Sequence, residues 1–311
     1  MLDYGRPKSW LRLVFSVRGS ALIRIRFRLL AVALISLVLT ILHEIGHIHT
    51  PLTLQALSLM GLALGIFLGF RNNTSYDRFW EGRRLWGALV NVSRTLTRDL
   101  LTVLPPGPQG EPSDVQRRQV HRLIAFVHAL RMGLRDQTNL DEIGLLLLLA
   151  PGDLEAIGSH RNVPNGILLR MAGEHRALKN ADQIGENWSV LLAERLSALS
   201  DIQGGCERIK TTPMPHSYNI LIHSIVALYV FALPFGLVTS LHYFTPVVVL
   251  MVAYTFLGLD AVGDELEDPF GEDLNDLPLS TICRTIEINL RQMLGEKDVP
   301  APLAAENGYY A

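Results

Sequence analysis

Four stretches of the chain are almost purely apolar, and they come in two pairs separated by a long polar region. The first pair covers residues 29–42 and 52–70, and the second pair covers residues 217–241 and 246–259; none of the four contains a charged residue. A membrane-spanning helix needs about 20 mostly apolar residues. The pattern therefore predicts four transmembrane helices in two hairpins, with the shorter stretches extended by a few flanking residues.

The polar region between the hairpins keeps a helical period. Apolar residues recur every three or four positions in residues 72–104, 115–135, 166–178 and 181–210, and a further helical pattern occurs around residues 141–150, as is typical of helices. The proline- and glycine-rich residues 105–112 predict a loop. Because no strand-like alternation occurs, we expect an all-α fold, with the second span continuing into the polar region without a break.

These patterns divide the chain into five parts. They are a basic amphipathic arm at residues 1–28 that lies along the membrane surface, a transmembrane hairpin at 29–70, a helical cytoplasmic portion at 71–216, a second transmembrane hairpin at 217–260, and a cytoplasmic acidic loop, helix and tail at 261–311.

The distribution of arginine predicts the orientation. Arg24, Arg26 and Arg28 precede the first span, and four arginines follow the second span within 14 residues. The loops between paired spans, residues 43–51 and 242–245, hold neither lysine nor arginine. Because lysine and arginine accumulate on the cytoplasmic side of membrane proteins, both termini are predicted to be cytoplasmic, in a multi-pass protein of the plasma (inner) membrane.

Composition excludes some function classes. Only 19% of the residues are charged and the net charge is -2, so no basic surface for nucleic acid is expected. The two cysteines, Cys206 and Cys283, are too few for a disulfide framework and are read as reduced thiols.

One short motif suggests an alternative function. Residues 43–47 read H-E-x-x-H, in which His43 and His47 would hold zinc and Glu44 would act as a general base. An intramembrane zinc protease would need a third ligand such as Asp260. The predicted topology places Asp260 on the opposite side of a membrane core of about 30 Å, so we favour an interfacial loop and no enzymatic activity.

Two blocks of sequence are distinctive. The first is FRNNTSYDRFWEGRRLWGAL at residues 70–89, and the second is GDELEDPFGEDLNDLPLSTICRTIEINLRQMLGE at residues 263–296. Together they resemble the bestrophin family of ion channels, in its bacterial branch. The resemblance implies a homopentamer in the lipid bilayer, with one central pore for small monovalent ions and no required cofactor.

By position against the family's neck motif, Leu62, Ile66 and Phe70 are expected to point into the pore. Their spacing of four residues places them on one helical face, and an apolar ring of this kind can gate by dewetting. The alternative is that the three side chains face lipid or neighbouring helices.

The resemblance also implies a second constriction in the cytoplasmic portion, which maps to Val190. Asp182, Glu186 and Glu194 recur around it at intervals of four, and copies of this face in an oligomer would form acidic rings that favour cations. Animal members of the family are chloride channels, so anions are nearly as well supported. The alternative is an ordinary solvated helix face.

The acidic loop at residues 268–276 corresponds to the calcium clasp of the family. Asp268, Asp273 and Asp276 fall on its ligand positions, and carboxylate oxygens suit calcium or another divalent cation. The acidic run is broken here by Leu274 and Asn275. The alternative is a structural loop that pairs with the arginines after the second span.

Overall fold

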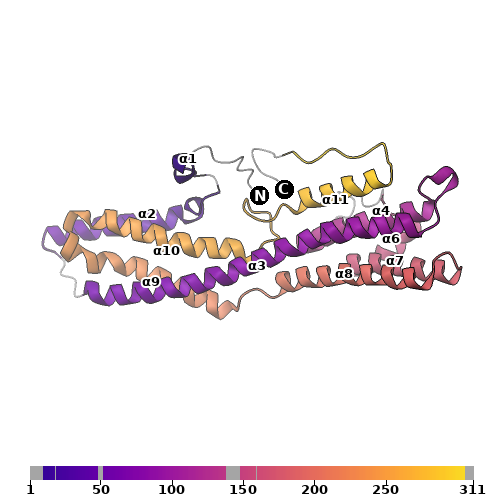
Figure 1. The fold of residues 1–311 in the computed structure, drawn as a ribbon. Coiled ribbons are helices and arrows are strands. Elements are labelled where there is room, and N and C mark those ends of the chain that lie inside the picture. The colour runs from indigo at the N-terminus through magenta and orange to yellow at the C-terminus, as the bar shows by residue number, and fades with distance from the viewer. Residues whose placement is uncertain (1–9, 18, 48–51, 138–147, 159, 305–311) are drawn as a thin grey trace. The chain divides into compact units, whose positions relative to one another are not determined.

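The computed structural model describes residues 10–304 except positions 18, 48–51, 138–147 and 159. All regular elements among these residues are helices, which confirms the all-α fold (Figure 1). The chain forms two compact units. The span unit contains the described residues up to Trp80 together with Pro213–Pro269, and the polar unit contains Glu81–Thr212 together with the described residues from Phe270. The ten residues after Phe70 therefore belong with the hairpins.

The span unit contains α1 (Trp10–Val14), α2 (Leu22–Glu44), the first part of α3 (Leu54–Val103), α9 (His216–Leu241), the turn η3 (His242–Phe244) and α10 (Thr245–Glu267). Helices α2, α3, α9 and α10 correspond to the four stretches expected to span the membrane. The start of the predicted N-terminal arm at residues 1–9, most of the helical pattern around 141–150 and the end of the predicted tail at 305–311 lie outside the described residues.

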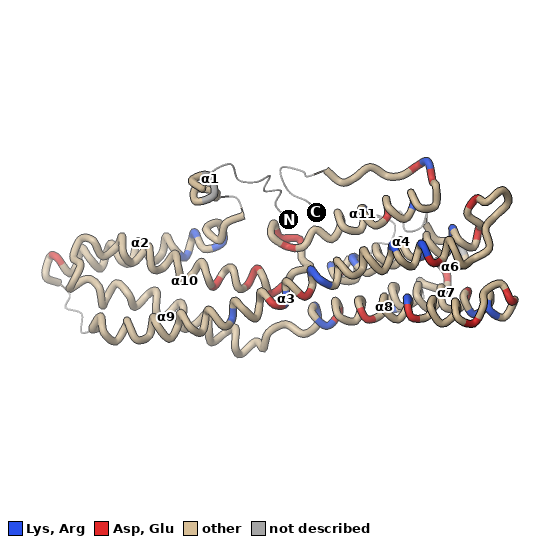
Figure 2. The backbone as a smooth tube through the Cα atoms, in the orientation of Figure 1, with Lys and Arg blue, Asp and Glu red and all other residues tan. Residues whose placement is uncertain are grey.

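Each hairpin helix is long enough to cross a membrane. A helix rises about 1.5 Å per residue, so the 23 residues of α2 and of α10 and the 26 residues of α9 exceed a hydrocarbon core of about 30 Å. The apolar helical run His216–Glu267 is divided by η3, and its two halves pack against each other as a hairpin. In α2 and α10, charged residues lie near the helix ends and leave the central turns bare (Figure 2).

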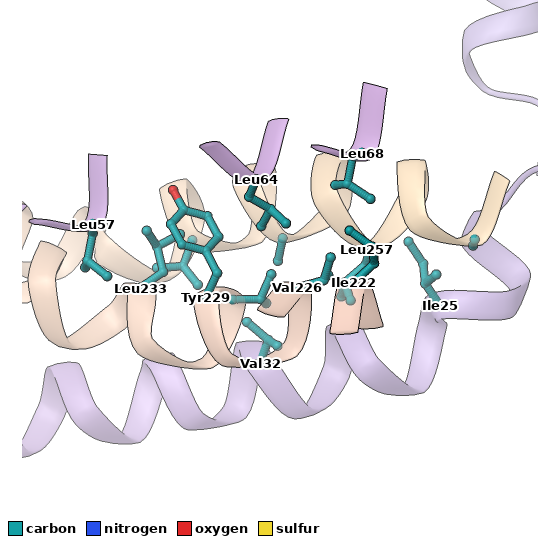
Figure 3. Packing of buried hydrophobic residues seen from close by; sticks show 14 of the residues in the cluster. Ile25, Val32, Leu57, Leu64, Leu68, Ile222, Val226, Tyr229, Leu233 and Leu257 are labelled. Atoms are coloured by element: carbon teal, nitrogen blue, oxygen red, sulfur yellow. The ribbon is translucent and has the colours of Figure 1, made fainter. Parts of the chain in front are cut away.

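The core of the span unit is an apolar cluster to which α2, α3, α9 and α10 all contribute (Figure 3). Leu57, Leu64 and Leu68 of α3 are at most 2% exposed within it. The other members are Ile25 and Val32 of α2 and side chains of α9 and α10, which are Ile222, Val226, Tyr229, Val230, Leu233, Leu237, Val249, Ala253, Leu257 and Ala261. One side of α3 is thus packed against α9 and α10, with Tyr229 close to Gly61 and Leu57 close to Gly236.

Helix α3 continues without interruption for 50 residues, as the sequence predicted. It ends at Val103, and Gln116 closes that end by donating two hydrogen bonds of 3.0 Å to the carbonyl oxygens of Leu101 and Leu104. Gln116 also completes a capping box with Ser113 at the start of the next helix. Such reciprocal caps satisfy backbone groups that a helix end leaves unpaired.

The described residues of the polar unit add five helices and one short turn to the second part of α3. They are η1 (Pro108–Gly110), α4 (Asp114–Leu134), α6 (Pro151–Gly158), α7 (Val163–Asn180), α8 (Glu186–Thr211) and α11 (Leu279–Met293). Helices α4, α7 and α8 correspond to the periodic segments read from the sequence. The start of α8 differs by five residues, because a turn at residues 181–185 precedes it.

A buried ionic network joins α4, α6 and α7 in the polar unit. Arg122 donates to both carboxylate oxygens of Asp153 at 2.8 and 3.0 Å and also contacts Glu174. Burial alone would raise the pKa of Asp153, but Arg122 and Arg170 outweigh burial and hold that pKa below its ordinary value. Burial would likewise raise the pKa of Glu174, but Arg118 and Arg122 lower it below the ordinary value.

His175 lies beside this network but forms no hydrogen bond with it. It is 5% exposed, and neither ring nitrogen has a hydrogen-bond partner among the described residues. Burial lowers the pKa of His175 from 6.5 to about 4, with a further contribution from Arg122 that Glu174 opposes. His175 is therefore neutral in the folded protein at neutral pH.

We expect the substitution His175→Leu to reduce the acid sensitivity of the protein. The unfolded chain takes up a proton on this histidine below about pH 6.5 and the folded chain only near pH 4, so the folded state loses about 3 kcal/mol as the pH falls across that window. Thermal unfolding of the detergent-solubilised protein at both ends of the window measures the effect. His160→Asn, at an exposed histidine of the same unit, is the control. An equal loss of stability in wild type and His175→Leu would contradict the assignment.

Both cysteines are free and buried, in agreement with their reading as reduced thiols. Burial raises the pKa of Cys206 and that of Cys283 to about 12. Because the thiolate is the reactive form, both side chains act as small apolar groups of the polar unit.

Candidate functional site

The predicted neck residues share one face of α3. Leu62, Ile66 and Phe70 have 66%, 51% and 63% of their surfaces exposed. The helical period places them opposite Leu64 and Leu68, which are buried in the span-unit core. The helix thus has one side packed within the chain and one apolar side open to a partner, to lipid or to a pore.

Arg71 follows Phe70 directly and fixes this helix to α10. Its side chain is fully buried, and its Nη1 donates to the carboxylate of Asp260 at 2.9 Å and to the carbonyl oxygen of Asp260 at 3.1 Å. Its Nη2 contacts the carboxylate of Asp264. Each of these hydrogen bonds involves a charged group, which makes it stronger than a bond between neutral groups. The last residue of the neck motif is therefore next to a side chain that is held by three bonds to α10.

Two further contacts hold the same part of α3 close to α10. Asn72 donates to the carbonyl oxygen of Leu259 at 3.1 Å, and Arg78 donates to the carbonyl oxygen of Glu267 at 3.1 Å. Gly263 allows the close approach, because a Cβ atom there would overlap the side chain of Asn72. Arginines after the second span thus bind α10, in line with a structural role.

The predicted cytoplasmic constriction lies at the start of α8. Val190 is 52% exposed, and Glu186 and Glu194 are exposed one turn to either side of it. The placement of Asp182 on the same helical face is wrong, because Asp182 lies in the turn before α8 and has a φ of 53°. Glu186 forms an ion pair of 2.7 Å with Lys179. The helix face around Val190 therefore carries fewer acidic residues than the sequence suggested.

The acidic loop shows features of a structural turn. Asp276 is 4% exposed, and its carboxylate accepts a hydrogen bond of 2.7 Å from the backbone N–H of Asp273. Arg135 of α4 donates to the carbonyl oxygen of Phe270 at 3.3 Å, which ties the loop to α4. Asp268 and Asp273 are exposed. One oxygen of Asp276 is thus engaged inside the loop, as expected for a structural turn.

The zinc-protease motif does not form a zinc site. Helix α2 ends at Glu44, so His47 lies beyond the helix and is not on a shared helical face with His43. Glu44 instead accepts a hydrogen bond of 2.8 Å from Nδ1 of His242, in the turn between α9 and α10. Asp260 is at the other end of α10, paired with Arg71. The three candidate zinc ligands are therefore not brought together.

Comparison with known proteins decides the family. A family model of bacterial and fungal bestrophin proteins matches residues 1–292. The chain belongs to the bestrophin family. Among its relatives, the voltage-dependent anion channel-forming protein YneE of Escherichia coli K12 is 41% identical over 308 residues, covering 98% of both chains. A protein of the same channel name from Ralstonia nicotianae is 40% identical over 303 residues, covering 95% of both chains.

A solved bestrophin structure has the same fold. The crystal structure of a bacterial bestrophin homologue from Klebsiella pneumoniae superposes with a TM-score of 0.80 at 40% identity, covering 88% of this chain and 99% of that one. The two sequence relatives are named as voltage-dependent anion channel-forming proteins, and the solved structure is a bestrophin homologue, which confirms the membrane fold, the family and a non-enzymatic role.

Sequence reasoning missed the charged cluster that anchors the neck helix. Asp260 was considered only as a zinc ligand, and Arg71 only as an orientation signal. His223 was read as part of an apolar span. An ionisable residue within or at the end of a membrane span is a functional candidate by default, and this rule applied to His223 and Asp260 would have found the cluster.

Proposed function

We propose that several copies of this chain, five by the family resemblance, associate in the plasma (inner) membrane to form an ion channel. The observation that carries the proposal is the open apolar face of α3, where Leu62, Ile66 and Phe70 are more than half exposed on a helix whose other side is buried. A ring of such faces makes a narrow apolar neck, which controls conduction through wetting. The channel names of relatives 40–41% identical support the same role.

The proposed orientation places both termini in the cytoplasm. Arg28 at the start of α2 and Arg71 of α3 both lie within 4 Å of Asp260, at the end of α10. The turn between α9 and α10 and the end of α2, which meet at the Glu44–His242 pair, contain no lysine or arginine. The arginine-rich end of the span unit therefore faces the cytoplasm by the positive-inside rule.

We propose that the channel conducts small monovalent ions and that the residues around Val190 bias it toward cations. Glu194 is exposed one turn from Val190, and in an oligomer its carboxylates would form a negative ring. The names of the relatives point toward anions instead, and Glu186 is partly neutralised by Lys179. We also propose that conduction requires no divalent cation.

Ion flux through the purified protein in liposomes tests the proposal. Under a gradient of potassium chloride, the reversal potential is expected to move toward the potassium equilibrium potential, with or without a calcium chelator. A Glu194→Gln variant removes the negative ring and should bring the reversal potential nearer to zero. The control is Glu155→Gln, at an exposed glutamate of α6, which removes the same charge away from Val190 and should keep the wild-type reversal potential.

Two other outcomes of this measurement would contradict different parts of the proposal. A reversal potential at the chloride equilibrium potential would keep the channel and overturn the cation preference. The absence of any flux from well-folded protein would overturn the channel proposal itself and favour a membrane scaffold.

A further inference from the structure

Four charged groups from three helices surround one histidine of α9. The Nδ1 atom of His223 lies 2.9 Å from a carboxylate oxygen of Asp260, and its Nε2 atom lies 3.4 Å from a carboxylate oxygen of Asp264. Arg71 binds both carboxylates, and Arg28 lies 3.8 Å from Asp260. A pocket of about 300 Å³ is lined by Arg28, His223 and both aspartates.

Each ring nitrogen of His223 has a carboxylate oxygen nearby. A neutral ring has one N–H group and one lone pair, whereas a protonated ring donates from both nitrogens. Here both nitrogens of His223 face a carboxylate oxygen. In the neutral form one lone pair would point at a negative oxygen, which is repulsive.

The charge balance of the cluster also favours a proton at this position. Arg71 carries one positive charge against the two negative charges of Asp260 and Asp264, which leaves one negative charge in excess. Protonation of His223 removes that excess. The side chain of Arg28 is 57% exposed, so water and salt screen its contribution.

The remaining groups packed around His223 do not supply another titration near neutral pH. One turn earlier on α9, Asn219 binds the carboxylate of Glu267 of α10. The other pocket walls are apolar, with Val32 of α2 and Phe231 of α9 among them. Of the groups named here, only a histidine ordinarily changes its charge between about pH 5 and pH 8.

We propose that His223 is a proton-binding site that couples cytoplasmic pH to the neck helix, a role that rests on the proposed channel function. Arg71 is the residue after Phe70, and its two aspartate partners are the same two that flank His223. Protonation completes the pairing of both aspartates and holds α3 firmly against α9 and α10. The narrow apolar neck then stays closed more of the time, so flux falls as the pH falls.

A histidine with two carboxylates is also a set of groups that could hold a transition metal. The guanidinium of Arg71 already contacts one oxygen of each carboxylate, and its charge repels a dication. A proton is therefore the occupant that the charges favour, and metal uptake becomes an outcome of the test.

The experiment compares the wild type with His223→Gln, which cannot take up a proton, at about pH 6 and about pH 8 on both sides of the membrane. We expect wild-type flux to be several-fold lower at the acidic pH and the flux of His223→Gln to be the same at both. His242→Gln is the matched control, since His242 also pairs with a carboxylate but belongs to the other end of the span unit. It should keep the wild-type pH profile.

The thermal unfolding midpoint of the detergent-solubilised protein reports on the site without reference to flux. The midpoint of the wild type minus that of His223→Gln should be larger at the acidic pH. If this difference depends on pH while no variant conducts, the proton site stands and the channel function fails. A difference that does not change with pH would overturn the proton site even in a conducting protein. Stoichiometric binding of added zinc chloride that requires His223 and abolishes the pH effect would also overturn it.

Discussion

Replacing Arg71 with methionine is expected to destabilise the span unit by about 3–5 kcal/mol, because breaking a buried ion pair leaves an uncompensated charge. Arg71 is fully buried, and Asp260 is 1% exposed. Without the guanidinium, the two carboxylates of Asp260 and Asp264 would share only His223 and the exposed Arg28. The expected result is a marked fall in the unfolding midpoint of the purified protein.

Two further variants separate the loss of charge pairing from the loss of packing. Arg84→Met changes an exposed arginine of the same helix and should shift stability by about 0.5 kcal/mol or less. Adding Asp260→Asn to Arg71→Met removes one of the orphaned charges and should restore part of the lost stability. If Arg71→Met is no more harmful than Arg84→Met, the anchoring role of Arg71 is wrong.

Replacing Ile66 with alanine is expected to raise the flux through the channel several-fold while leaving the fold intact. The side chain is 51% exposed on the open face of α3 and is not part of the span-unit core. Truncation in every copy of an oligomer widens an apolar neck and eases its wetting. Single-channel conductance in planar bilayers measures the effect.

Leu64 provides the matched control for this prediction, since it lies two residues away and faces the opposite side. It is 2% exposed within the core cluster, so Leu64→Ala should destabilise the protein by about 2–5 kcal/mol. Together the two variants distinguish a pore-facing position from a packed one. An unchanged conductance in folded Ile66→Ala would contradict the assignment of Ile66 to the neck of the pore.

Much of the fold could be predicted because it follows from local patterns. Long uncharged stretches predicted α2, α9 and α10, and the absence of a break after Phe70 predicted the continuous helix α3. The exposed positions of Leu62 and Ile66 follow from helical period once the buried side is known. The position of Asp182 was predicted wrongly, because a periodic count cannot detect a turn in which one residue takes a φ of 53°.

The sequence by itself determined the long helices, the apolar stretches long enough to span a membrane and the family, since each depends on the order of residues along a short stretch or on whole-chain similarity. Only the tertiary structure decided which charges meet. Arg71 and Asp260 are separated by 189 positions in the sequence, and His223 and Asp260 are separated by 37. No periodicity records such pairings, because the energy of a buried ion pair depends on distance and burial in three dimensions. For the same reason, only the tertiary structure showed that Glu44 binds His242 and does not belong to a zinc site.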